Sequence, residues 1–286
     1  MASWYFKVME QKIDLKSALE CWTQLGVDDI LVEKSVDRFE SIEETLDLVP
    51  SKPEAAPRVE PPSRPVQPQV APAISASEAN SKARQLAKSA LTLDELRTAM
   101  EEFEGCPLKY TATHTVFADG NPKAKVMLVG EAPGADEDRY GKPFVGLSGQ
   151  LLDKMFSHIG LTRQENLYIS NILPWRPPGN RQPTPAETSA CVPFIQRHIE
   201  LVSPDYLIMV GGTSAKTLLD TRDGIMRLRG KWREYKTDGL DQPIKTMAIF
   251  HPAYLLRSPG QKREIWKDLL VIKNSLLKDG INLDYA

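Results

Sequence analysis

The sequence has few of the features that would place it in a membrane or in a disulfide-stabilised secreted scaffold. No stretch approaches the roughly 18 uninterrupted apolar residues of a membrane-spanning helix. The first residues, MASWYFKVMEQKIDLKS, lack an apolar segment followed by a small-residue cleavage site, so we expect no secretory signal. The three cysteines, Cys21, Cys106 and Cys191, are widely spaced, which favours a reducing compartment over a disulfide framework.

Several common catalytic motifs are also missing. The sequence contains no HExxH, no GxSxG, no paired CxxC, no Walker phosphate loop and no GxGxxG. The net charge is −2, which by itself argues against a polyanionic partner. However, residues 1–80 hold 8 Lys/Arg and 14 Asp/Glu, a net of −6, so the remainder carries −2 − (−6) = +4. A mildly basic remainder is compatible with binding nucleic acid.

Composition divides the chain into three parts. Residues 1–48 contain LKSALECWTQLG, whose apolar residues have helical spacing, and we expect a small helical segment there. Residues 49–80 are rich in Pro and Ala and are predicted to be a disordered linker. Residues 81–286 alternate apolar runs with helical patterns and are predicted to be the globular domain.

The pattern of this third part predicts an α/β fold. Strands are expected at 124–130, 166–172, 205–212 and 246–252, and the main helices at 148–160, 184–202 and 261–278. Nearly continuous apolar strands that alternate with helices are typical of a parallel sheet covered on both faces. We therefore predict a short parallel sheet of about four strands.

Polar residues follow the predicted strands. Glu131 follows the first, Asn171 ends the second, and His251 lies at the end of the fourth. Ligands of open α/β sheets bind at the carboxyl ends of the strands, so we expect these side chains to share one edge. The first of these strands continues into GEAPGADEDRYGKPFVGLSGQLL (Gly130 to Leu152), which combines small residues, carboxylates and an aromatic ring between glycines.

Several segments together carry a resemblance to a known family. They are GEAPGADED with GKPFVGLSGQLL, NILPWRPPGNR followed by PTPAE, LRGKW, and HPAYLLR with KREIWKDL. In this order and spacing, over roughly residues 100–280, the chain resembles a family 4 uracil-DNA glycosylase, of the bacterial and archaeal branch of that superfamily. The resemblance implies a three-layer α/β/α fold. It also implies a monofunctional enzyme that flips uracil out of DNA and hydrolyses its N-glycosidic bond, leaving an abasic site.

The chain departs from this family at its iron–sulfur site. The resemblance implies a [4Fe–4S] cluster on four cysteines, but the matching positions here are Phe103, Cys106, Trp175 and Cys191. Phe and Trp cannot ligate iron, and a cubane cluster needs four protein ligands. We therefore predict that no cofactor or metal is bound, that the two aromatic residues fill the volume, and that Cys106 and Cys191 are vestigial. The alternative reading of both cysteines is that they are ordinary buried residues.

The resemblance assigns the base-binding residues. Phe144 would stack on the flipped base, Asn171 would read uracil through its amide, and Gly130 and Ala132 complete this group. An amide can donate to O4 and accept from N3–H of uracil, whereas cytosine reverses that pattern. A core phenylalanine and a turn asparagine are the alternatives.

The resemblance also assigns the residues for bond cleavage. His251 would hydrogen-bond the uracil O2 and stabilise the charge that develops on the leaving base. Glu131 would orient a water, since Ala132 stands where the wider superfamily often has an Asp. Glu137 and Asn180 resemble residues implicated in activity. The alternative for Glu137 is a carboxylate that stabilises its loop.

DNA contacts are expected from three places. Gly134 and Gly212 would let the backbone approach phosphate. Leu256 and Arg257, in a predicted loop, would supply an apolar wedge and a cation. Lys262 and Arg263 would meet phosphate at the start of the last helix or form a solvated helix face, and Arg229 is either a DNA contact or part of an ion pair.

Two other functions remain open at this stage. The chain could be a catalytically degenerate DNA-binding or adaptor protein, or a glycosylase for another deaminated base. We expect uracil-containing DNA as the partner, with a protein partner open for residues 1–80, no membrane association and a monomeric state. The resemblance to bacterial and archaeal enzymes places it in the cytoplasm, at the nucleoid.

Overall fold

The computed structural model describes residues 75–283. Its sheet has six strands in the order β1-β3-β2-β4-β6-β5. The strands are β1 (Ala118–Gly120), β2 (Val126–Gly130), β3 (Leu167–Asn171), β4 (Tyr206–Val210), β5 (Trp232–Tyr235) and β6 (Ile244–Ile249). The expected segments for residues 1–48 and for most of 49–80 lie outside the described residues.

The four predicted strands are confirmed as β2, β3, β4 and β6, and their mutual pairings are all parallel. The predicted sheet was too small, because β1 and β5 add antiparallel edges against β3 and β6. Neither edge strand contains an apolar run that would predict it from the sequence. β1 is only ADG, and in β5, WREY, only the last residue is buried.

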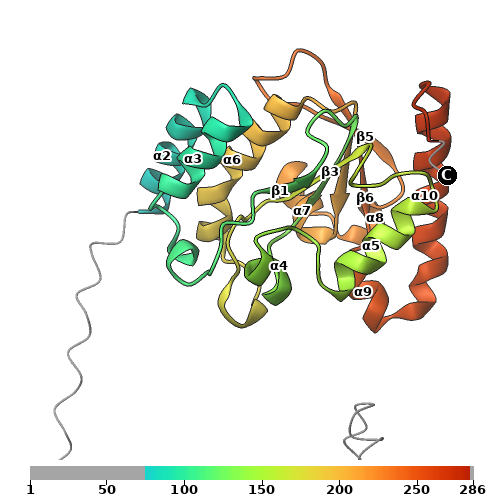
Figure 1. The fold of residues 1–286 in the computed structure, drawn as a ribbon, viewed down its shortest axis with the longest axis horizontal. Coiled ribbons are helices and arrows are strands. Elements are labelled where there is room, and N and C mark those ends of the chain that lie inside the picture. The colour runs from blue at the N-terminus through green and yellow to red at the C-terminus, as the bar shows by residue number, and fades with distance from the viewer. Residues whose placement is uncertain (1–74, 284–286) are drawn as a thin grey trace, which may run out of the picture. The chain divides into compact units, whose positions relative to one another are not determined.

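Helices cover both faces of this sheet (Figure 1). The helices of the described chain are α2 (Ala76–Ser89), α3 (Leu93–Glu102), α4 (Ala135–Tyr140), α5 (Leu147–Ser157), α6 (Pro185–Val202), α7 (Gly212–Leu218), α8 (Ile225–Leu228), α9 (Pro252–Arg257) and α10 (Lys262–Lys278). Short 3-10 turns are η3 (Pro107–Tyr110), η4 (Pro178–Asn180) and η5 (Pro259–Gln261). None of these helices is long and apolar enough to cross a membrane.

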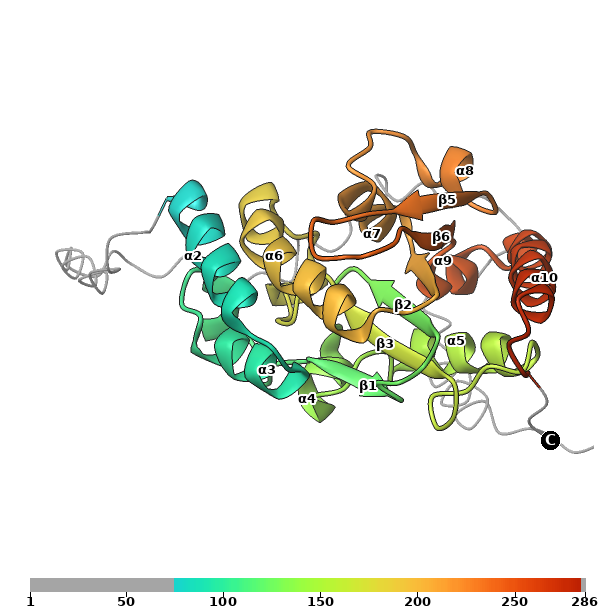
Figure 2. The ribbon, with the colours of Figure 1, turned by 90° about the horizontal axis from the view of Figure 1, so that it is seen from above.

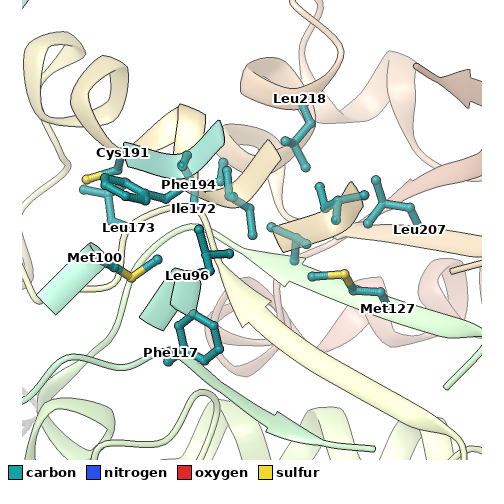
Figure 3. Close-up of a cluster of buried hydrophobic side chains, with 14 of the residues drawn as sticks. Leu96, Met100, Phe117, Met127, Ile172, Leu173, Cys191, Phe194, Leu207 and Leu218 are labelled. Carbon is teal, nitrogen blue, oxygen red and sulfur yellow. The ribbon is translucent and has the colours of Figure 1, made fainter. Parts of the chain in front are cut away.

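The core is split by the sheet into two clusters, which gives the predicted three layers. Seen from above, α2, α3 and α6 lie on one side of the sheet and α5 and α10 on the other (Figure 2). Alternate residues of β2 enter opposite clusters: Met127 packs with the α2–α3–α6 side, and Leu128 with the α5–α10 side. Figure 3 shows the first of these clusters, with Cys191 and Phe194 of α6 on one side and Met127 and Leu207 of neighbouring strands on the other.

Two helix starts follow from their sequences. α6 begins with a capping box, in which the Thr184 hydroxyl accepts from Glu187 N–H and the Glu187 carboxylate accepts from Thr184 N–H. α2 begins at Ala76 with a similar box between Ser75 and Glu78. The helix therefore starts before residue 81, in a Ser/Ala-rich stretch whose composition favoured the linker.

Candidate functional site

The pocket of interest opens at the carboxyl edge of the parallel strands. β2 ends at Gly130 and β3 at Asn171, while β6 ends at Ile249, just before His251. These chain ends, together with the segments that follow them, enclose a cavity of about 420 Å³. The predicted site residues that line it are Glu131, Ala132, Gly134, Glu137, Phe144, Asn171, Asn180, His251 and Arg257.

Phe144 and Asn171 lie on either side of Gly130 in the wall of this cavity. Both side chains are buried, each with 5% exposure. A Cβ atom at Gly130 would lie 2.4 Å from Asn171 Oδ1 and 2.5 Å from Phe144 Cζ, so only glycine fits between them. Gly130 is not among the residues that line the cavity, and its lack of a side chain leaves room for the Phe144 ring and the Asn171 amide.

The Asn171 amide has an unusual environment. Its Oδ1 is fully buried and accepts no hydrogen bond in the described chain. A buried carbonyl oxygen without a partner costs free energy of about 1–3 kcal/mol, so a ligand that donates a hydrogen bond to this atom would recover that cost. Asn171 and Phe144 both line the cavity, and the buried Oδ1 of Asn171 is an acceptor without a partner in the described chain.

His251 is held at the start of α9. Its Nδ1 accepts a hydrogen bond from Ala253 N–H at 3.1 Å, and its ring centroid lies 5.7 Å from that of Phe144. Burial lowers the pKa of His251 to about 4, and the nearby Arg257 cation acts in the same direction. The imidazole is therefore neutral near pH 7, and because Nδ1 is an acceptor, the ring proton sits on Nε2. The site thus holds a neutral N–H donor.

This charge state can be tested without a substrate. In an NMR titration, we expect the ring of His251 to take up its proton with a midpoint near pH 4. An unfolded histidine titrates near 6.5, so between pH 6.5 and 4 the unfolded chain binds the proton first. The contribution of His251 to the free energy of unfolding should thus be intact above pH 6.5 and decrease as the pH falls to 4. A midpoint near 6.5 would contradict a neutral, buried ring.

The two carboxylates beside the cavity differ in what they bind. Glu137 is buried and accepts from three backbone N–H groups: Gly134 at 3.0 Å, Val145 at 2.9 Å and Gly146 at 3.0 Å. Glu131 is half-buried, and within residues 75–283 its carboxylate has no hydrogen bond or ion pair. Glu137 is committed to its loop, whereas Glu131 is free to bind a ligand or a water.

Asn180 enters the cavity from the RPPGNR segment. It has a positive φ of 54°, is exposed, and its Oδ1 accepts from Arg176 Nε at 2.7 Å. The neighbouring Arg181 also lines the cavity and binds Glu187, whose pKa this arginine lowers to about 2. The sequence analysis did not single out Arg181, whose ion pair with Glu187 is visible only in the folded chain.

The expected DNA contacts differ in their surroundings. The predicted loop over 254–257 is wrong: this stretch is helical, because Pro252 at its first position and the His251 cap start α9. Leu256 is 45% exposed on α9. Lys262 and Arg263 are exposed at the start of α10, and Gly212 starts α7; none of these three lines the cavity.

Arg229 belongs to the fold rather than to a free surface. Its guanidinium pairs with Asp268 at 2.8 Å and with Glu264 at 3.4 Å, and it lies 4.7 Å above the ring of Phe250. Of the two alternatives for Arg229, a DNA contact or an ion pair, the structure shows the ion pair.

The other residues that line the cavity and that the sequence analysis did not single out are Pro133, Ser148, Pro177, Gln182, Pro183 and Ala253.

The four positions of the implied cluster lie in the buried core. Phe103 and Trp175 are almost completely buried, the first packed edge-on against Phe194 at 5.1 Å and the second donating from Nε1 to Thr115 Oγ1 at 3.1 Å. Cys106 and Cys191 are buried free thiols, and the interaction between them lowers the pKa of the Cys106 thiol and raises that of Cys191. Within residues 75–283, no three His, Cys, Asp or Glu side chains gather as a metal site would require. These residues do not fit a four-cysteine cluster.

Known proteins resemble the part of the chain that contains this site. A profile of the uracil DNA glycosylase superfamily matches residues 117–270. A type-4 uracil-DNA glycosylase of Archaeoglobus fulgidus is 38% identical over 62% of this chain and 89% of its own length. The type-4 enzyme of Thermotoga maritima is 36% identical over 61% of this chain and 90% of its own. A type-5 uracil-DNA glycosylase of Thermus thermophilus is 32% identical over 53% of this chain and 75% of its own.

Proposed function

The chain belongs to the uracil-DNA glycosylase superfamily, in its type-4 branch, and on that premise we propose that it excises uracil from DNA by hydrolysing the N-glycosidic bond. The observation that carries the proposal is the convergence of Phe144, the unpaired Asn171 Oδ1 and the neutral His251 at one cavity. A uracil ring offers each of these groups a partner. The product would be an abasic site in the DNA.

Recognition of the base would use Phe144 and Asn171. The flipped uracil stacks on the Phe144 ring, and the N3–H of uracil donates to Asn171 Oδ1 while the amide N–H donates to O4. Cytosine presents an acceptor at N3 and a donor at C4, so both contacts fail. Because Asn171 Oδ1 is buried, leaving it unpaired against cytosine is costly.

Bond cleavage would use His251 as an electrostatic partner. As the bond between C1′ and N1 breaks, its electron pair moves onto uracil, and negative charge grows on O2. The Nε2–H of a neutral His251 donates to this oxygen, and the contact strengthens as the charge develops. The sugar becomes an oxocarbenium-like cation that a water then attacks at C1′.

Positioning of that water falls to Glu131 in this proposal, because its carboxylate is free while Glu137 is bound to its loop. Replacing Glu131 by glutamine should slow single-turnover excision by about 10²-fold, the low end of the range for a general base, since a preformed cation needs little help from its nucleophile. Asn180→Ala, measured alongside, should slow it less, because the Asn180 amide oxygen is engaged by Arg176. A larger effect from Asn180 would reverse the assignment.

The grip on DNA would come from the mouth of the cavity. Leu256 on α9 is the exposed apolar residue that would fill the gap left by the flipped base, and Arg257 would hold a neighbouring phosphate. Gly134 and Gly212 would contribute backbone N–H groups, and Lys262 and Arg263 would extend the contact along the duplex. For Glu137 we propose a positioning role through its loop.

We also propose that the enzyme works without an iron–sulfur cluster. Two of the four ligand positions are occupied by aromatic rings that complete the packing of α6 against the neighbouring segments. None of the steps above involves a metal. The two cysteines that remain, Cys106 and Cys191, are buried as free thiols.

The function is tested by a single-turnover assay on oligonucleotides that carry one uracil, one hypoxanthine or one cytosine. We expect alkali-labile sites from the uracil strand alone. Salt-sensitive binding of all three DNAs without excision would favour an adaptor, and excision of hypoxanthine in preference to uracil would favour a different base.

A further inference from the structure

The backbone of Phe144 is in a conformation that needs support. Its φ is 54°, in the left-handed region that residues with a Cβ rarely adopt. Helix α5 presses on this residue as well: a Cβ atom at Gly149 would lie 1.9 Å from the Phe144 carbonyl oxygen. Such a conformation persists only where the surroundings fix it, and it occurs at sites where a side chain must be aimed.

The group that fixes the carbonyl side of this loop is Arg163, between α5 and β3. Its Nη1 donates to the Pro143 carbonyl at 2.6 Å, and its Nη2 donates to the Phe144 carbonyl. The side chain is only 10% exposed. A planar guanidinium holds two adjacent carbonyls at once, which a lysine cannot do.

Arg163 is itself held by two carboxylates. Its Nε donates to Asp153 Oδ1 at 2.8 Å, and its Nη1 contacts Asp119 Oδ2 at 3.1 Å. Asp119 also pairs with Lys142 at 3.2 Å. The guanidinium is thus tied to α5 through Asp153 and to β1 through Asp119, so its position is fixed by two separate elements.

The amide side of the same loop is fixed by Glu137. Its Oε1 accepts from the N–H groups of Val145 and Gly146, the two residues after Phe144. Arg163 takes the carbonyls of residues 143 and 144, and Glu137 takes the amides of 145 and 146. Together the two side chains bind the backbone on both sides of the Phe144 ring. Glu137 lines the cavity, whereas Arg163 does not.

We propose that Arg163 is a positioning residue for the excision reaction, which acts by holding Phe144 in the left-handed conformation that places its ring beneath the base. The proposal rests on the proposed stacking of uracil on Phe144. Arg163 reaches neither the base nor the sugar, so its whole effect passes through Phe144.

The test is a double-mutant cycle in single-turnover excision. Phe144→Ala should slow excision by about 10- to 100-fold, the range for loss of one base–aromatic stack. Arg163→Met should slow excision severalfold but by no more than Phe144→Ala does, because a misplaced ring can lose at most what the ring contributes. The double variant should be no slower than Phe144→Ala alone, because removal of the ring removes what Arg163 holds. Arg163→Lys should restore only part of the rate.

Arg197→Met is the matched control. Arg197 also binds a backbone carbonyl, that of Ala90, through Nε at 3.0 Å and Nη2 at 2.9 Å, and pairs with Glu200 at 3.1 Å, but it lies outside the reaction cavity. The Arg197→Met substitution should lower the melting temperature and leave the excision rate of the folded protein unchanged. If Arg163→Met unfolds the protein, Asp153→Asn weakens the same arginine more gently and should show the same non-additivity with Phe144→Ala.

The outcomes separate the two claims. If Phe144→Ala leaves the rate unchanged, stacking on Phe144 is refuted and the role of Arg163 with it. If Phe144→Ala slows excision but Arg163→Met behaves like Arg197→Met, only the positioning role is refuted. If the effects of Arg163→Met and Phe144→Ala multiply in the double variant, Arg163 acts by another route, and the proposal is likewise overturned.

Discussion

Replacing His251 by alanine should slow single-turnover uracil excision by about 10²- to 10³-fold, the loss seen when one preorganised donor to a developing anion is removed. The structure explains why the effect should be large. The ring is neutral near pH 7, its proton is on Nε2, and Ala253 N–H fixes its orientation through Nδ1. The donor therefore needs no reorganisation as charge appears on uracil O2. The rate constant is measured with enzyme in excess, from the fraction of alkali-cleaved strand over time.

The matched control for this variant is His158→Ala. His158 is exposed at the end of α5, next to Trp266, and does not line the cavity. Its removal should leave the excision rate unchanged. If His251→Ala were as fast as His158→Ala, the leaving base would be stabilised by another group, and the proposed chemistry would have to be rebuilt.

Replacing Asn171 by alanine should slow uracil excision by about 10²-fold, because two hydrogen bonds to the base are lost in a site that excludes water, at about 1–1.5 kcal/mol each. The ratio of uracil to cytosine excision should fall in parallel, since the amide that rejects cytosine is gone. The same single-turnover assay, run on matched uracil and cytosine oligonucleotides, gives both numbers.

Asn80→Ala is a suitable comparison for Asn171→Ala. Asn80 lies on α2 and donates to the Ser189 carbonyl at 2.6 Å, so its loss removes a structural amide contact away from the cavity. Excision by Asn80→Ala should match the wild type. Unchanged excision and discrimination by Asn171→Ala would contradict its assignment as the reader of the base.

Sequence alone predicted the parts of the fold that depend on long apolar runs. β2, β3, β4 and β6 are nearly continuous apolar segments, and their parallel order follows from the helices between them. β1 and β5 were missed, because a short or polar edge strand is defined by its neighbour and not by its own sequence. α9 was taken for a loop, since its helical start depends on the His251 cap.

The candidate site shows the same division. Glu131, Asn171 and His251 were placed correctly at one edge, because the ends of parallel strands coincide. The engagement of Glu137 by three backbone amides was left open, since those N–H groups converge only when the loop closes. Arg163 left no signal: two of its partners are backbone carbonyls, which every residue has, and neither of its carboxylate partners, Asp119 and Asp153, stands at a spacing that marks an ion pair in the sequence.

In this account, the proposed base pocket keeps its residues while two of the four positions of the implied cluster are aromatic. Phe103 and Trp175 are packed as core residues, and the two remaining cysteines are buried as free thiols. In this account the cluster serves no step of the reaction, and aromatic packing takes over its place in the core.

The most direct test of that account is uracil excision by protein treated with a strong iron chelator and by untreated protein, with iron determined in the same samples. We expect equal rates from both, and iron far below one atom per chain in fresh protein. Stoichiometric iron in fresh protein, with excision lost on chelation, would contradict the account and show that the chain holds a cluster through ligands other than four cysteines.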